Sequence, residues 1–253
     1  MSSFLTEKDP SQPPTNNTPA VIKLKEEPKA ATVEYLFKAS FMITYILLLT
    51  TATITFIEAL RTDDPTIRHI FNLETCISLV AGYFYSVFVA ELDTSEKNKH
   101  TIDWPTITKT RYIDWSITTP FMLLVLCLFL ANESKRVVRV TTVVCVVILN
   151  YIMLYFGYLG ETGVLDRMTA CIGGFVPFIA LFYLIYSSYV VTGEGFGKYF
   201  LFVFYIFFWT GYGLVYLLEE AYKNIAMNIL DCISKCFVGI GIWMYYTNIM
   251  PEF

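Results

Sequence analysis

The hydrophobic positions of the chain gather into seven long runs separated by short polar breaks. The runs cover about residues 33–60, 70–92, 106 or 113 to 131, 137–160, 168–192, 199–218 and 222–250. A helix that crosses the hydrocarbon core of a bilayer needs about 20 predominantly apolar residues. Short connections favour antiparallel neighbours. The pattern therefore predicts an all-α protein, a bundle of seven transmembrane helices.

Two stretches fall outside this pattern. Residues 1–30 hold five of the ten prolines among many polar side chains, a composition typical of a disordered tail. The tail has no apolar segment behind a basic start, so we do not expect a cleavable signal peptide. Residues 91–105 form the longest and most polar connection and are expected to be a surface loop. We predict a tail over 1–30 and one transmembrane domain over 31–253.

Composition supports a membrane protein. Hydrophobic residues make up 55% of the chain and charged residues only 16%, whereas a soluble domain has about 25% charged residues. Membrane lipid is therefore the expected partner, and assembly into a homo-oligomer is compatible with the sequence. The net charge of −4 and the lack of a basic patch argue against a nucleic-acid partner. Six cysteines without a CxxC motif, and only two histidines, indicate buried thiols and no metal site.

The orientation in the membrane rests on basic residues near the ends of the runs. Lys and Arg are spread almost evenly over the two sides, so the positive-inside rule gives only a weak preference. Lys135 and Arg136, with Arg61 and Arg68, favour their own side as cytoplasmic. This places the N-terminus outside the cell and the C-terminus in the cytoplasm.

The last run carries four polar residues on one helical face: Asn224, Asn228, Asp231 and Lys235. Each charge in mid-membrane costs about 2.5–3.5 kcal/mol on insertion scales, so the two charges need a reason to be there. One interpretation is a structural salt bridge between residues four apart. The other is a lysine that carries a covalent cofactor, with the aspartate as its counter-ion.

The third run carries a second charged face, formed by Arg111, Asp114 and Thr118. An interfacial Arg–Asp pair next to a kink at Pro120 is the structural alternative. However, two carboxylates, an arginine and Lys235 at similar depth would form a neutral group. Such a group suits a protonated Schiff base on the lysine, because nearby carboxylates favour the positive charge.

Aromatic residues complete this picture. Trp209, Tyr212 and Tyr216 form a stripe on one face of the sixth run, which by itself is more typical of a core than of a cofactor pocket. Trp115 lies beside Asp114 in the third run. Two tryptophans from different helices would fit on either side of a long, flat polyene.

These residues resemble those of the microbial (type I) rhodopsins. The resemblance is carried by Arg-Tyr-x-Asp-Trp-x-x-Thr-Thr-Pro in the third run and Asp-x-x-x-Lys in the seventh, and covers about residues 33–250. It implies a light-activated membrane protein, not an enzyme, with all-trans retinal bound covalently to Lys235. The second run is similar to rhodopsins of giant viruses and marine protists.

The resemblance also implies roles for the polar residues. Asp114 matches the primary counter-ion and proton acceptor, and Asp231 the second counter-ion. Arg111 matches the arginine beneath them, and Thr118 the hydroxyl that hydrogen-bonds the acceptor. The pair Thr119 and Asn150 would link the third and fourth helices. The resemblance implies a retinal pocket formed by Trp115, Thr119, Met122, Asn150, Met153, Gly157, Trp209, Tyr212 and Tyr85.

The sequence departs from the family at three positions. Val125 stands where bacteriorhodopsin has its cytoplasmic proton-donor aspartate, eleven residues after the acceptor. Gly213 replaces the pocket proline, and Tyr216 stands where a tryptophan is usual. The ion pathway is therefore expected to use other polar residues: Glu74, Ser78, Asn224, Asn228, Glu219 and Glu220. We place the last two at the outer end of the sixth helix, as part of a proton-release group or as a solvated helix end.

The favoured function is light-driven outward proton transport through the Schiff base of Lys235, with Asp114 as acceptor. Without a donor at Val125, reprotonation must be slow or must use Glu74 or water. The alternative is a light-gated channel for small cations, lined by Glu74, Ser78, Asn224, Asn228 and Ser234. A sensory photoreceptor without transport is the third hypothesis.

Overall fold

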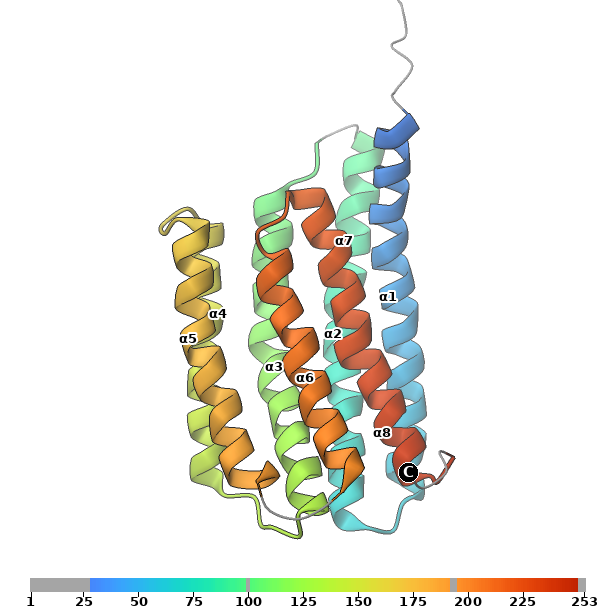
Figure 1. The fold of residues 1–253 in the computed structure, drawn as a ribbon. Helices are drawn as coiled ribbons and strands as arrows, with labels where there is room; N and C mark the ends of the chain where they lie inside the picture. Colours follow the sequence, from blue (N-terminus) through green and yellow to red (C-terminus); the bar gives the residue numbers. More distant parts are fainter. Residues whose placement is uncertain (1–27, 99–100, 192–194, 250–253) are drawn as a thin grey trace, which may run out of the picture.

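A computed structural model describes residues 28–98, 101–191 and 195–249, and within them the prediction of seven membrane-spanning helices is confirmed. The helices lie side by side as one bundle (Figure 1). Their bounds are α1 (Pro28–Arg61), α2 (Pro65–Asn98), α3 (Trp104–Glu133), α4 (Val140–Glu161), α5 (Arg167–Ile185) with the π-helical segment η1 (Tyr186–Val190), α6 (Phe196–Val215), and a seventh span built from α7 (Glu220–Asp231), the π-helical segment η2 (Cys232–Phe237) and α8 (Val238–Tyr246).

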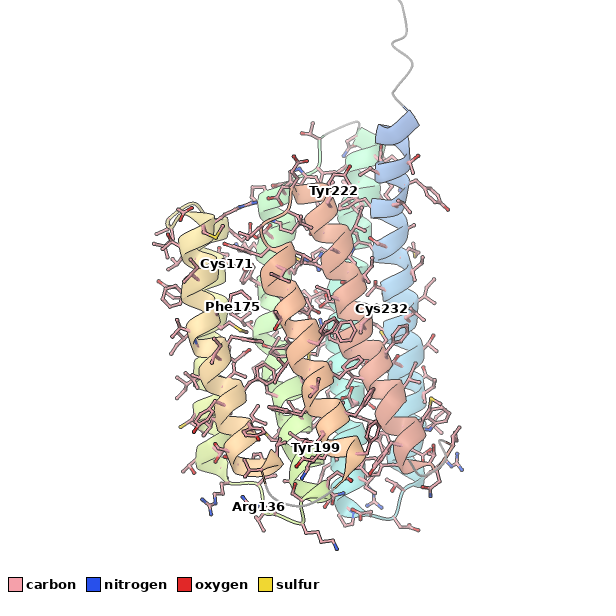
Figure 2. The ribbon with its side chains drawn as sticks, viewed as in Figure 1. Arg136, Cys171, Phe175, Tyr199, Tyr222 and Cys232 are labelled. Carbon is pink, nitrogen blue, oxygen red and sulfur yellow. The ribbon has the colours of Figure 1, made fainter. Side chains whose placement is uncertain are left out.

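The seventh span packs between α1 and α6, with one face turned toward the other helices and one face exposed. α4 and α5 form a pair at one side of the bundle, α1 and α2 lie at the other, and α3, α6 and α7 lie between them (Figure 1). Tyr222 marks the end of the bundle where α7 begins, and Arg136 and Tyr199 mark the opposite end (Figure 2).

Among the described residues, buried apolar side chains form two large groups and a small one of Trp115, Tyr216 and Met227. The largest joins α3, α5 and α6 with parts of α2 and α8. The second joins α1 and α2 to η2. The outer faces of all seven spans carry exposed large apolar side chains, for example Tyr183 and Val203. These faces suit contact with lipid, because lipid and protein core are equally apolar.

The structure corrects two predicted boundaries. Residues 91–98 belong to α2 rather than to a surface loop, since Leu92 and Ser95 pack into the bundle and extend the helix by two turns. α6 ends at Val215, so Glu219 and Glu220 lie at the start of α7 and not at the end of the sixth helix.

The N-terminal boundary also lies earlier than predicted. α1 begins at Pro28, inside the predicted tail, and proline is well suited to the first position of a helix. Residues 1–27 fall outside the described residues. The predicted disordered tail therefore stays a prediction.

All six cysteines are free, but they are not all buried as predicted. Cys76 and Cys145 are exposed on the outer surface of the bundle. In a transmembrane helix an apolar position can face lipid as well as the core, and the sequence pattern does not separate the two.

Polar caps fix where two of the pocket helices begin. Asp103 accepts a hydrogen bond from the Thr106 amide at the start of α3. Asp166 accepts hydrogen bonds from the hydroxyl and amide of Thr169 and the amide of Met168 at the start of α5. These hydrogen bonds hold the pKa of the Asp166 carboxyl below its usual value. Caps of this kind satisfy helix amides that have no partner within the helix.

Candidate functional site

Lys235 lies in the π-helical segment η2 in the middle of the seventh span. Its side chain is only 1% exposed. In η2 the backbone amide of Val238 bonds to the carbonyl of Ile233, one residue further back than in an α-helix. Single-turn π-helical segments inside α-helices are rare and occur frequently at functional sites.

The Lys235 nitrogen belongs to a group of four buried charges. Its Nζ lies 2.9 Å from Asp114 Oδ2 and 3.3 Å from Asp231 Oδ1. Arg111 Nη1 lies 3.4 Å from the other oxygen of Asp231. Two anions and two cations thus form a neutral group inside the bundle, which removes much of the cost of burying each charge alone.

The two aspartates differ in how many partners they have. Asp231 accepts hydrogen bonds from Tyr85 at 2.8 Å, Tyr212 at 2.7 Å and the Trp115 indole at 3.3 Å. Asp114 Oδ2 is bound only by Lys235, and Asp114 Oδ1 has no hydrogen-bond partner in the described part of the chain. Asp231 is therefore fixed as an anion, whereas Asp114 keeps room for a proton.

Arg111 is held from the seventh span. Its Nη2 donates to Asn224 Oδ1 at 3.0 Å and to Asn228 Oδ1 at 2.8 Å. The guanidinium also lies 5.2 Å from the centre of the Phe88 ring, within the range of a cation–π contact. The two asparagines predicted to line an ion pathway therefore anchor the arginine.

The two threonines of α3 bond to different groups. Thr118 donates to the main-chain carbonyl of Asp114 at 2.9 Å. The predicted hydrogen bond to the Asp114 carboxylate is therefore not formed among the described residues, because the hydroxyl is used within its own helix. Thr119 donates to the carbonyl of Trp115 and accepts a bond from the Asn150 amide at 2.8 Å. The latter bond links α3 to α4 at the place the sequence analysis expected.

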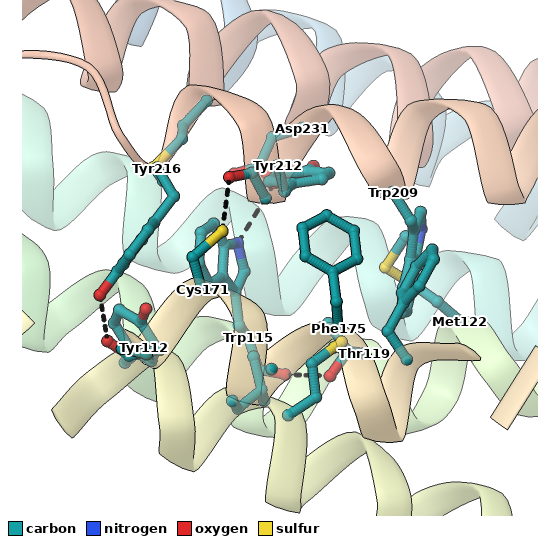
Figure 3. Close-up of a pocket in the computed structure, with 18 of the residues that line it drawn as sticks. Tyr112, Trp115, Thr119, Met122, Cys171, Phe175, Trp209, Tyr212, Tyr216 and Asp231 are labelled. Carbon is teal, nitrogen blue, oxygen red and sulfur yellow. Dashed lines mark hydrogen bonds between the residues drawn. The ribbon is translucent and has the colours of Figure 1, made fainter. Parts of the chain in front are cut away.

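Lys235 is one of the residues that line a cavity with mostly apolar walls. Aromatic side chains point into it from α3, α5 and α6 (Figure 3). Eight of the predicted pocket residues line it: Trp115, Thr119, Met122, Met153, Gly157, Trp209, Tyr212 and Lys235. Asn150 does not, because it lies behind Thr119, and Tyr85 lies on α2 behind Asp231.

The sequence pattern did not predict the residues that form one wall of this cavity. That wall comes from α5, with further residues from α3, α4 and α7, and comprises Ala170, Cys171, Gly174, Phe175, Phe178, Tyr112, Leu154 and Met227. Its α5 members recur at helical spacing on one face. However, every face of α5 is apolar, so hydrophobicity gave no signal that this one faces a cavity.

The two family departures on α6 have structural consequences. A Cβ atom on Gly213 would lie 2.5 Å from the Phe175 ring, so the ring occupies the space a larger residue would need. Tyr216 donates to the carbonyl of Gly157 at 3.0 Å, and the Cys171 thiol donates to the carbonyl of Gly213 at 3.4 Å (Figure 3). Hydrogen bonds therefore hold this part of the cavity wall, where the family usually has a proline and a tryptophan.

Glu74 does not line this cavity; it lies on α2, close to Gly239 of α8. It is 1% exposed and takes part in no ion pair within the described ranges. Ser78, one turn along α2, is also fully buried, and its hydroxyl has no hydrogen-bond partner among the described residues. We call Glu74, Ser78, Thr51 and Gly239 the Glu74 compartment, and Arg111, Asp114, Asp231 and Lys235 the counter-ion cluster.

Glu220 joins an ion-pair network at the end of the bundle where α7 begins. It lies 2.6 Å from Arg167 and 2.9 Å from Lys223, and Lys223 also lies 2.8 Å from Glu161. The network ties together the adjoining ends of α4, α5 and α7. Glu219 is exposed and stays outside it.

Known proteins resemble this chain in sequence and in fold. The profile of the bacteriorhodopsin-like protein family matches residues 36–249. A green-light absorbing proteorhodopsin from the gamma-proteobacterium EBAC31A08 is 28% identical over 159 residues, which cover 56% of this chain and 61% of that protein. Opsin-1 of Neurospora crassa is 25% identical over 216 residues, 74% of this chain and 69% of its own length.

A solved structure is similar over almost its full length. The crystal structure of the viral rhodopsin OLPVRII has 41% sequence identity and a TM-score of 0.78, and the match covers 85% of this chain and 99% of that one. The chain therefore belongs to the bacteriorhodopsin-like protein family, the microbial rhodopsins, which are multi-pass membrane proteins with a retinal chromophore and not enzymes.

Proposed function

We propose that this protein transports protons outward in response to light, with all-trans retinal bound covalently to the Lys235 nitrogen. The observation that carries the proposal is the 2.9 Å contact between Lys235 Nζ and Asp114 Oδ2. It sets a carboxylate within direct reach of a proton on that nitrogen, inside a site that excludes bulk water. General acid–base transfer requires a separation of this order.

The residues present fit the cofactor. Trp115 and Trp209 both line a mostly apolar cavity, and Lys235 is the only lysine in its wall. Pockets for apolar ligands have such walls, with few polar groups that fix orientation. Bound there, retinal supplies a light-driven change of shape that alters how strongly the attached nitrogen holds its proton.

The chain's own residues then determine where the proton goes. Asp114 accepts it from the Lys235 nitrogen, because Asp114 Oδ1 is open while Asp231 is occupied by Tyr85, Tyr212 and Trp115. Asp231 stays ionised and, with Arg111, balances the charge that remains. Arg111 points from the cluster toward Asn224, on the side where α7 begins, which suits an exit in that direction.

Reprotonation of the nitrogen must come from the opposite side. Val125 is fully buried in the apolar core and offers no proton there. Glu74 is the carboxyl that we assign to this step. Because it is buried without a cation partner, its environment favours the neutral acid, which is the form a donor needs. We assign the Glu74 side to the cytoplasm and the start of α7 to the cell exterior.

One observation favours a second candidate, a light-gated cation channel. Buried hydroxyl and amide groups follow the boundary between α1, α2 and α7 over much of its length: Thr44, Thr51, Ser78, Tyr85 and Asn228. In the present state Arg111 closes this boundary through its bonds to Asn224 and Asn228. Ser234, expected on the same path, instead bonds Tyr212 on the cavity side.

Photocurrent against voltage separates the two functions. A pump drives outward current at zero voltage without an ion gradient, and the current of a channel reverses at the equilibrium potential of its ion. We expect outward current at zero voltage, lost in Asp114→Asn. A current that reverses with the cation gradient would contradict the pump and support the channel.

A further inference from the structure

We propose that Gly239 and Thr51 are positioning residues that seat the Glu74 carboxyl against the seventh span, one turn from Lys235. The inference rests on the proposed role of Glu74 in reprotonation and adds the means by which that carboxyl is held. Neither residue contains an ionisable group, and sequence pattern alone gives no reason to single them out.

The contact itself is the first argument. A Cβ atom on Gly239 would lie 3.1 Å from Glu74 Oε2 and 2.9 Å from the Thr51 methyl carbon. Both distances are tighter than ordinary van der Waals contact, so a methyl group at this position would require Thr51 or the Glu74 carboxyl to shift. Glycine at residue 239 therefore allows the Glu74 carboxyl to lie where it does.

Gly241 shows that this closeness is local. It lies two residues further along the same helix, and a Cβ atom there would have no heavy atom within 4 Å. The two glycines therefore share a helix and a sequence neighbourhood, but only Gly239 faces the carboxyl. This makes Gly241 a matched control.

We call the place at Gly239 and Thr51 that holds the Glu74 carboxyl the seat. The register between α2 and the seventh span places the seat one helical turn from Lys235. These helices run antiparallel. Tyr85 on α2 bonds to Asp231, and Glu74, three turns earlier on α2, lies against Gly239. Gly239 follows Lys235 by four residues and hence lies on the same helical face. Ser78 falls between the two contacts, near the level of Lys235.

The hydroxyl groups around the seat are the second, independent argument. Thr51 and Ser78 are fully buried, and neither hydroxyl bonds to a nitrogen or oxygen in the part of the chain the structure describes. Among the described residues, the polar group beside the Thr51 hydroxyl is the weakly polar thiol of Cys236. Most buried polar groups are satisfied by protein or by ordered water. These two hydroxyls can therefore bind water that carries a proton from the seated carboxyl toward Lys235.

The seat explains how a carboxyl on α2 can serve a nitrogen on the seventh span. A glutamate side chain has three rotatable bonds, and a long unrestrained side chain would sample several positions. The narrow space at Gly239, which the carboxyl shares with the Thr51 methyl group, limits the positions it can take. A displacement of about 1 Å at such a site is enough to slow a transfer by up to about 100-fold.

The test uses the full chain reconstituted with retinal in lipid. Flash photolysis gives the rate at which the Lys235 nitrogen regains its proton, and infrared difference spectroscopy gives the carbonyl band of protonated Glu74, assigned with Glu74→Gln. We expect Gly239→Ala to shift the band and to slow the rate by about tenfold or more. Gly241→Ala adds the same methyl group in open space and should leave both unchanged.

A second variant covers the case that Gly239→Ala does not fold or bind retinal. Thr51→Val keeps the shape of residue 51 and removes only its hydroxyl. We expect the Glu74 band to shift to higher frequency, because water that the Thr51 hydroxyl binds no longer donates a hydrogen bond to the carbonyl. The slowing should be smaller than in Gly239→Ala.

The outcomes separate the seat from the proposed function. If Glu74→Gln leaves reprotonation unchanged, Glu74 is not the donor and the proposal falls with that role. If Glu74→Gln slows it but Gly239→Ala and Thr51→Val match the wild type in rate and band, the seat is wrong and the donor stands. A shifted and slowed Gly239→Ala in a protein that carries no outward current keeps the seat and overturns the pump.

Discussion

The counter-ion cluster and the Glu74 compartment lie on two sides of the same lysine and solve the burial of a carboxylate in opposite ways. In the cluster, two carboxylates face two cations, and Tyr85, Tyr212 and Trp115 add hydrogen bonds. In the compartment, Glu74 lies against a glycine, with no ion-pair partner among the residues described.

This difference gives the proton transfer a direction. A carboxylate surrounded by cations and donors is stable as an anion, and it can accept a proton only when the neighbouring nitrogen releases one. A buried acid without a cation is stable when neutral and therefore starts with a proton to give. Asymmetry between the two sides, rather than any single residue, makes net transport in one direction chemically reasonable.

The largest expected effect removes the residue that both regions serve. Lys235→Ala should abolish the visible absorption band that forms when retinal is added, because no other lysine lines the cavity. Lys109→Ala, at an exposed position of α3, is the control and should keep the band. Absorption spectra of the purified variants decide this. A visible band in Lys235→Ala would remove the basis of the comparison.

The next largest effect comes from removing one of the two carboxylates of the counter-ion cluster. Asp114→Asn removes the acceptor and an anion 2.9 Å from the nitrogen. We expect the band to move to longer wavelength, because a cationic nitrogen with one anion fewer has a lower excitation energy, and the outward current to disappear. Spectra and photocurrents measure the two effects. An unshifted band would contradict the counter-ion role of Asp114.

A smaller effect comes from restoring a donor on the compartment side. Val125→Asp should speed the return of the proton to Lys235, most clearly in a Glu74→Gln background. Burying the new acid costs stability, about 2.5–3.5 kcal/mol on insertion scales, so the thermal midpoint should fall. Flash photolysis gives the rate. If the double variant is no faster than Glu74→Gln alone, a missing donor does not limit the cycle.

The smallest effect concerns a bond outside both regions. Thr119→Val removes the hydroxyl that accepts a hydrogen bond from the Asn150 side-chain amide at 2.8 Å. A buried amide left without its partner should cost about 1–3 kcal/mol of stability, with little change in the proton-transfer rates. Thermal loss of the visible band measures the stability. A large change in the rates instead would place Thr119 in the transfer path.

The sequence predicted the charged residues of the counter-ion cluster better than it predicted the cavity. Arg111, Asp114, Asp231 and Lys235 stand out because charges are rare in apolar runs, and helical spacing shows which of them share a face. The α5 wall gave no such contrast, since Cys171 and Phe175 are apolar residues in an apolar helix. The family resemblance places Tyr85 in the pocket. Its hydrogen bond to Asp231 shows instead that it lies behind the counter-ion cluster.

Local periodicity was enough to predict the seven spans and the all-α class. The cost of polar groups in lipid was enough to predict that the charges lie in a protein interior. The tertiary structure alone decided that α2 continues through residue 98, that Asn224 and Asn228 hold Arg111, and that Glu74 meets Gly239. These features depend on which faces of distant helices meet and at what register. Packing between helices sets both, and no local pattern encodes them.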